Sequence, residues 1–438
     1  MKKFVIFMMG VIAVGVIFIS FAGHDIPEVD GLDLVVERPD VADEDNAYTY
    51  FCEATNCMIR PGDISAVREY SYGMSTVACE QVVNVIVSNS QMFAVMRRGV
   101  ACDVCVVPEV DGAGLIPYLH DWLTIGKIMG ADVSYQLELG NSAAATARCV
   151  DELRFGNLVQ QGSGSLIQYL VGVAVLDMGL GQAMVIARDG ETSLDDLNRL
   201  AEVVAELGPF NCGLVNGAKV EYRMAVYYID KLCKDLRVGD VDGMIGYEIP
   251  KFLFSRHIPG YVFKPNETKA AFADLCRKNI ANIPRIYADV DLSGVEDFGN
   301  ERNRFLYIVK PNAVGKLMYN MIVANFRSVI EKKCRLESKV AGVRLVVALR
   351  IYEKKNGCLP DSLSVLVPDY IDKIPRDPYD GKPFRYDKAG GIVYAVGGDL
   401  KDSGGSTNLI RSGKSRRCRF GNTEDIVFEM GKNEDGSL

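Results

Sequence analysis

Two short motifs bring chemically capable side chains close together in this sequence. Cys102 and Cys105 form the only C-x-x-C pair among twelve cysteines, and this spacing serves disulfide bridges, thiol redox chemistry and metal binding. A single pair is a weak zinc signal, and no thioredoxin-like strand-to-helix pattern surrounds it. We favour a bridge or simple packing, with redox chemistry and metal binding as the alternatives.

The second motif is His120 followed by Asp121, since a carboxylate can orient an imidazole for proton transfer. The chain has only three histidines, and it contains no G-x-S-x-G, H-E-x-x-H, P-loop or G-x-G-x-x-G sequence. Those motifs mark common hydrolases, zinc proteases and nucleotide-binding enzymes. We interpret His120 and Asp121 as a surface or core pair, and we predict no catalytic residue from a linear motif.

The composition limits the class of protein further. The chain has 438 residues, of which 48% are apolar and 24% are charged. This mix excludes a disordered chain and allows two or three domains with a real core. Acidic residues outnumber basic ones by 57 to 49, which gives a net charge of −8 and argues against a nucleic-acid partner.

Residues 1–23 have the pattern of a membrane anchor or a signal peptide. Lys2 and Lys3 precede an uncharged apolar run over residues 4–23, and about 20 apolar residues suffice to cross the hydrocarbon core. Acidic residues follow the run, and this asymmetry keeps the N-terminus inside. Ser20 and Ala22 also fit a signal-peptidase site. We predict an exported protein. It is either anchored in the inner membrane through residues 4–23 and faces the periplasm, or it is periplasmic after cleavage.

The next parts of the chain are an acidic segment and a helical body. Residues 24–45 are acidic and without periodicity, which predicts a solvated spacer that holds the body off the membrane. Residues 46–330 carry apolar residues at three- and four-residue steps, which predicts an all-α body of helical hairpins. The expected helices cover residues 64–87, 115–129, 142–158, 165–187, 194–207, 218–236, 267–280 and 313–329.

One stretch of the body, residues 155–187, is apolar enough to be a second membrane span. It also contains several glutamines and glycines, and amide side chains are costly in hydrocarbon unless they find partners. We favour a central helix that its neighbours bury on all sides.

The last quarter, residues 331–438, changes character and predicts a small α+β module. An amphipathic helix covers residues 331–356 and ends at Gly357, with Pro360 preventing its continuation. Alternating runs over 384–386 and 392–396 predict a β-hairpin, and residues 425–430 a third strand. The expected fold class is therefore mainly α, with a membrane or signal helix, an all-α body and a C-terminal long helix with an antiparallel sheet.

The order of motifs over about residues 335–430 resembles the globular domain of the type II secretion major pseudopilins. The segments that carry the resemblance are Asn356-Gly357-Cys358-Leu359-Pro360-Asp361, Pro375-Arg376-Asp377-Pro378, Gly381-Lys382-Pro383, Tyr394-Ala395-Val396-Gly397 and Asp399-Leu400-Lys401-Asp402. The whole chain is similar to large exported bacterial proteins of unassigned function that carry this ending. The resemblance implies a binding or scaffolding role in the envelope, through contact of this module with another envelope protein.

Major pseudopilins bind calcium in the loop after their sheet, and the resemblance therefore implies Asp399, Asp402 and Asp425 as possible calcium ligands. A hard cation takes six to eight oxygens, which carboxylates and loop carbonyls supply. The alternative is a metal-free turn, because Asp and Gly favour turns and the basic residues of 411–419 can neutralise the carboxylates. For the whole chain, the alternative function is an exported hydrolase with a site between the helices of the body.

Overall fold

The computed structural model describes residues 24–75, 77–109, 118–238, 261, 263–291, 293, 311–322, 326–408 and 424–431. The predicted membrane or signal segment, residues 1–23, and the basic run over 411–419 lie outside these residues. Both therefore remain predictions from the sequence.

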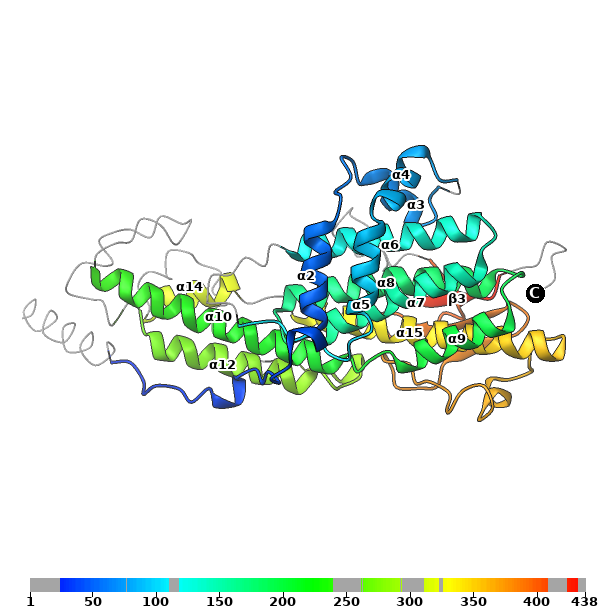
Figure 1. Ribbon diagram of the computed structural model, residues 1–438. Coiled ribbons are helices and arrows are strands. Elements are labelled where there is room, and N and C mark those ends of the chain that lie inside the picture. The colour runs from blue at the N-terminus through cyan, green and yellow to red at the C-terminus, as the bar shows by residue number, and fades with distance from the viewer. Residues whose placement is uncertain are drawn as a thin grey trace, which may run out of the picture.

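The protein is mainly helical, with one small sheet near the C-terminus (Figure 1). The described helices are α2 (Ala47–Cys57), α3 (Ser65–Ser71), α4 (Glu80–Ser88), α5 (Ser90–Gly99), α6 (Tyr118–Glu138), α7 (Ser142–Gln161), α8 (Leu166–Arg188), α9 (Leu194–Glu206), α10 (Asn211–Val238), α12 (Pro265–Asn282), α14 (Ala313–Ile322) and α15 (Phe326–Asn356). Strands β1 (Arg385–Asp387), β2 (Ile392–Val396) and β3 (Asp425–Glu429) form an antiparallel sheet in the order β1-β2-β3. The prediction of a mainly helical protein with a small antiparallel sheet near the C-terminus is confirmed.

Some predicted helix limits are wrong, each for a local reason. Residues 64–87 form two helices instead of one, because the chain turns at Gly73, which has a φ of +68°. The range 313–329 likewise contains α14 and the first turn of α15, and the predicted start of the long helix at residue 331 falls inside α15. Helices α2 and α5 were not predicted.

Helix α8 is the central helix of the body. It packs against α6, α7, α10 and α15. The α7–α8 crossing is close because glycines lie in it: a Cβ atom on Gly156 would lie 2.5 Å from the backbone nitrogen of Leu176, and one on Gly172 would overlap the backbone of Gln160. Within the described part of the chain, only α8 has the length and composition to cross a membrane, and 67% of its most apolar window is buried in the protein. This packing favours the central-helix interpretation over a second span.

Helix α15 joins the C-terminal module to the body. One face of it packs on α8 and α9, and it also contacts β2 and β3. Arg350 of α15 is buried, and its Nε donates a hydrogen bond of 3.0 Å to the carbonyl of Ala187 at the end of α8. One of two clusters of buried apolar side chains runs through α7, α8, α9, α10 and α12 into α15 and the sheet.

The segment that follows the predicted anchor is docked, and the prediction of a solvated spacer is wrong for residues 24–38. We call these residues the strap. Leu34 and Val36 are only 1% and 4% exposed, and burial of such side chains contributes about 1.5–3 kcal/mol each. The strap runs along α12 (Figure 1), and its one-turn helix Leu32–Leu34 contacts both α10 and α12.

The molecule is elongated (Figure 1). Helices α10, α12 and α14 form an arm at one end, where the described chain begins. Helix α9, the sheet and the end of α15 lie at the other end. A lobe that contains α3 and α4 projects to the side. Residue 24, where the described chain begins, and the C-terminal sheet are therefore far apart.

Candidate functional site

Five large apolar side chains of the lobe are exposed. Met74 is 68% exposed, Val77 66% and Val87 65%, and Ile59 and Tyr72 are also largely exposed. Helix α4 buries Val82 and Ile86 on its inner face and leaves Val87 in solvent. We call these five exposed residues the lobe patch. Several large apolar side chains exposed on one lobe make it a candidate surface for binding another macromolecule.

An open groove of about 400 Å³ lies beside the lobe patch, between residues 59–62 and α4. Asn89 is 1% exposed and holds the two walls together. Its side chain accepts a hydrogen bond of 2.9 Å from the amide of Ile59 and donates one of 3.0 Å to the carbonyl of the same residue. The groove is lined by Ile59, Arg60, Pro61, Gly62, Glu80, Gln81, Asn84, Val85 and Ser88. This mixture of backbone, amide and apolar groups suits a peptide or protein surface better than bond-breaking chemistry.

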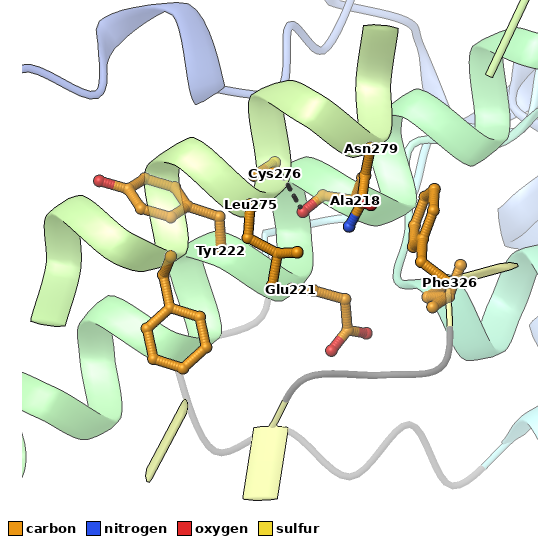
Figure 2. A pocket seen from close by; sticks show the side chains of 9 residues that line it. Ala218, Glu221, Tyr222, Leu275, Cys276, Asn279 and Phe326 are labelled. Carbon is orange, nitrogen blue, oxygen red and sulfur yellow. Dashed lines mark hydrogen bonds between the residues drawn. The ribbon is translucent and has the colours of Figure 1, made fainter. Parts of the chain in front are cut away.

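A small cavity between α10, α12 and α15 is too small for a substrate (Figure 2). Its volume is about 40 Å³, whereas ligand pockets usually enclose about 300–1,000 Å³. Burial raises the pKa of the Glu221 carboxyl, and it raises the pKa of the Cys276 thiol to about 12. Cys276 donates a hydrogen bond of 3.3 Å to the carbonyl of Ala218. A protonated thiol that is hydrogen-bonded in this way is a poor nucleophile.

The C-x-x-C motif lies where the chain returns alongside α2. Cys105 is buried and Cys102 is half-buried, and both thiols are free. Between them Val104 pairs with Asn46, whose side chain also bonds the backbone of Val106. Burial raises the pKa of both thiols, so neither resembles an activated redox cysteine. This geometry favours the packing interpretation.

The two residues of the His120–Asp121 motif do not act as a pair. His120 is exposed. Asp121 binds the guanidinium of Arg60 instead, with distances of 3.1 Å to Nε and 2.8 Å to Nη2. The carboxylate therefore does not orient the imidazole.

Asp425, one of the three proposed calcium ligands, is fully buried at the start of β3. Its Oδ2 accepts hydrogen bonds from the backbone amides of Ser403, Gly405 and Ser406 at 3.1, 2.8 and 3.0 Å. Three amide donors satisfy this carboxylate without a metal, and they close the loop between β2 and β3 onto the sheet.

Asp402 and Asp399 take different partners in the same loop. Asp402 binds Nε of Arg385 at 3.1 Å and accepts the amide of Gly404. Burial alone would raise the pKa of Asp402, but these hydrogen bonds and the charge of Arg385 outweigh it and lower the pKa. Asp399 is half-buried and accepts the amide of Lys401.

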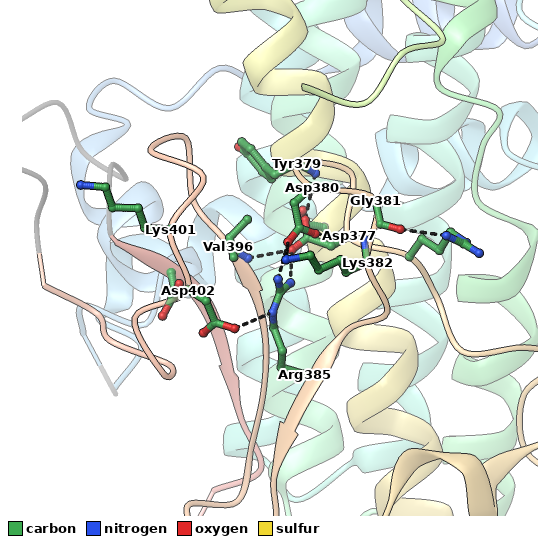
Figure 3. Close-up of polar contacts among 12 residues, drawn as sticks. Asp377, Tyr379, Asp380, Gly381, Lys382, Arg385, Val396, Lys401 and Asp402 are labelled. Atoms are coloured by element: carbon green, nitrogen blue, oxygen red, sulfur yellow. Dashed lines mark hydrogen bonds and ion pairs between the residues drawn. The ribbon is translucent and has the colours of Figure 1, made fainter. Parts of the chain in front are cut away.

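Arg385 on β1 is the centre of a polar network that the sequence did not reveal (Figure 3). Its guanidinium binds three carboxylates, those of Asp377, Asp380 and Asp402. Asp377 is fully buried and also accepts the amides of Tyr379 and Val396. Burial raises the pKa of Asp377 despite these donors. Arg385 therefore supplies a positive charge that links the turn around residue 380, the sheet and the loop.

The three proposed ligands do not converge on one point as a calcium site requires. Within the described ranges, no three Cys, His, Asp or Glu side chains form a group that could hold a metal ion. Asp425 faces amide donors and Asp402 faces a guanidinium, which a cation would have to displace. This arrangement favours the metal-free turn, and calcium binding stays a prediction.

Glu152 is a buried acid that sequence reasoning missed. It is 0% exposed on α7, and neither carboxyl oxygen has a hydrogen-bond partner. Burial raises its pKa well above the ordinary value. It lies beside Gly130 of α6 and the side chain of Ser71. Because the carboxyl is fully buried and its oxygens lack partners, we interpret it as a neutral core acid.

Comparison with family models, characterised proteins and solved structures finds no match to this chain.

Proposed function

We propose that this chain is an exported, membrane-anchored bacterial envelope protein with a binding or scaffolding role. The lobe patch and its groove carry the binding part of the proposal, because they form an open and partly apolar surface. The export part rests on the lysines and the apolar run of residues 1–23. No set of catalytic groups in the described ranges favours the competing hydrolase.

The C-terminal module is the second surface that we propose for contact with an envelope partner. Its resemblance to the pseudopilin domain is the reason for this choice. The attachment of the module through α15 supports it, because a long buried helix holds the sheet in one position relative to the body. The module also lies at the end away from residue 24, where a partner in the periplasm has access (Figure 1).

Affinity purification from membranes in mild detergent, after cross-linking in cells, tests the binding role. We expect a specific protein to co-purify with the wild-type chain. The double variant Met74→Asp, Val87→Asp removes the apolar character of the lobe patch, and Val365→Asp changes an exposed apolar side chain of the module. Loss of the partner in only one variant assigns the contact to that surface. Retention of the same partner in both variants, or its absence from the wild type, would contradict the proposal.

Export is tested by adding a protease to intact spheroplasts. We expect digestion of the body and co-sedimentation of the untreated protein with membranes after alkaline washing. Protection from the protease would contradict export. Digestion without sedimentation would show a cleaved signal and leave the binding role in place.

A further inference from the structure

The strap is attached to the arm by an unusual helix cap. Helix α12 begins at Pro265 after Lys264, a residue that makes no side-chain cap. Asp25 takes this role from the distant strap: its carboxylate accepts the amides of Asn266 and Glu267 at 2.8 and 3.0 Å. These are the second and third residues of the helix, which an N-cap side chain normally serves.

Further contacts hold the strap along its length. Arg277 of α12 binds the carboxylate of Asp33 through Nε and Nη2, at 2.9 and 2.8 Å, and the carbonyl of Asp30 through Nη2. Gly31 lies so close to α10 that a Cβ atom there would come within 2.8 Å of the Tyr222 hydroxyl. With Leu34 and Val36 buried, the strap has one defined position.

We infer that the strap holds the tip of the arm, where α10 ends and α12 begins, against the headgroups of the lipid bilayer. This inference rests on the proposed membrane anchor. The apolar run ends at Gly23, and two residues of extended chain reach at most about 7 Å. Asp25 is fixed on the first turn of α12, so the end of the apolar run cannot be far from that turn. A solvated spacer would have let the body move away from the membrane, whereas the docked strap does not.

The chemistry of the tip fits an anionic lipid surface. Lys231 and Lys234 are exposed near the end of α10. Two acids of the arm are paired with other lysines, Asp230 with Lys269 at 2.6 Å and Glu267 with Lys264 at 3.5 Å, and Asp235 beside Lys234 is half-buried. Exposed lysines attract the anionic headgroups of a membrane, and the attraction decreases with salt.

The test places a fluorescent amino acid in the full-length chain at position 234 on the arm or at position 365 on the module. The protein is reconstituted in nanodiscs that contain phosphatidylglycerol and a lipid with a nitroxide headgroup. We expect position 234 to lose most of its emission to the nitroxide and position 365 to keep it. A membrane-bound protein whose position 234 is not quenched would overturn the inference and leave the anchor intact. Failure of the wild type to enter nanodiscs would instead contradict the anchor.

Variants of the strap show whether docking causes this orientation. Asp25→Ala combined with Arg277→Gln removes the cap and the bidentate pair, and we expect quenching at position 234 to weaken while the protein stays in the nanodisc. Arg223→Gln is the matched control, because Arg223 of α10 pairs with Glu109 at nearly the same exposure as Arg277 with Asp33. Faster cleavage at Glu28 and Glu37 by a glutamate-specific protease would confirm that the strap has been released in a folded protein. Unchanged quenching in a variant with a released strap would overturn the inference.

Discussion

At the scale of single residues, Glu152 makes the stability of the protein depend on pH. The native state keeps a proton on this buried carboxyl that the unfolded chain releases above the ordinary pKa of 4.5. The free energy of unfolding therefore falls as the pH rises above that value and up to the raised native pKa. Below pH 4.5 the native and the unfolded state both hold the proton, and Glu152 no longer lowers the free energy of unfolding.

The variant Glu152→Gln should remove this dependence. We expect a higher melting temperature than that of the wild type at pH 8, and little difference at pH 4, measured by circular dichroism. Glu80→Gln, at an exposed position of α4, is the control and should change neither value. An equal shift at both pH values would show that the effect comes from packing and not from ionisation.

Arg385 is the second residue whose removal should have a large effect. Arg385→Gln leaves Asp377 buried without its cation, and loss of one partner of a buried ion pair costs about 3–5 kcal/mol. We expect a corresponding decrease in the free energy of unfolding in urea. Lys388→Gln removes an ion pair of the same sheet with the exposed Asp361 and should leave the urea midpoint nearly unchanged.

A chelator separates the metal-free turn from the calcium site. If Arg385 and the amides around Asp425 hold the loop, EDTA should not change the melting temperature of the full-length wild type. A clear decrease that calcium restores would show that Asp399, Asp402 and Asp425 bind the ion after rearranging.

At the scale of elements, the crossing of α7 and α8 depends on glycine. Gly172→Ala places a Cβ atom against the backbone of Gln160, whereas Gly181→Ala on the same helix meets nothing within 4 Å. Alanine favours a helix over glycine by about 0.5–1 kcal/mol. We expect Gly181→Ala to raise the melting temperature and Gly172→Ala to lower it. A higher melting temperature in both variants would show that α7 and α8 can move apart without loss of stability.

Local patterns predicted most of these elements. Apolar residues at three- and four-residue steps, with Gly and Pro at the ends, identified α7, α8 and α9 within a few residues. Alternating runs identified the strands equally closely. The same spacing continues through residues 64–87, so the turn at Gly73 could not be recognised from periodicity. The contacts of the candidate sites could not be predicted, because they join residues that are far apart in the sequence. The pseudopilin resemblance implied Asp402 as a ligand, but its contact with Arg385 joins residues whose pairing no local pattern encodes. The contacts of the strap with α12 are of the same kind.

At the scale of the whole molecule, the body and the module should unfold together. Trp122 is the single tryptophan, and it lies with Phe51 and Phe155 in the apolar cluster under the lobe. Leu349 lies in the other cluster, on α15. Both clusters include residues of α7 and α8. A substitution that destabilises one cluster should therefore destabilise the other.

The variant Leu349→Ala tests this coupling. A fully buried leucine truncated to alanine costs about 2–5 kcal/mol. We expect Trp122 fluorescence and far-ultraviolet circular dichroism to shift to lower temperature by the same amount. Val365→Ala, at an exposed position, should shift neither. A shift in circular dichroism without a shift in fluorescence would show that the two clusters melt separately.

The cap that Asp25 places on α12 also orders events during synthesis. Asp25 and the amide that it caps are 241 residues apart, so the first turn of α12 leaves the ribosome long after Asp25 does. The strap therefore cannot take its docked position until α12 has been synthesised and folded.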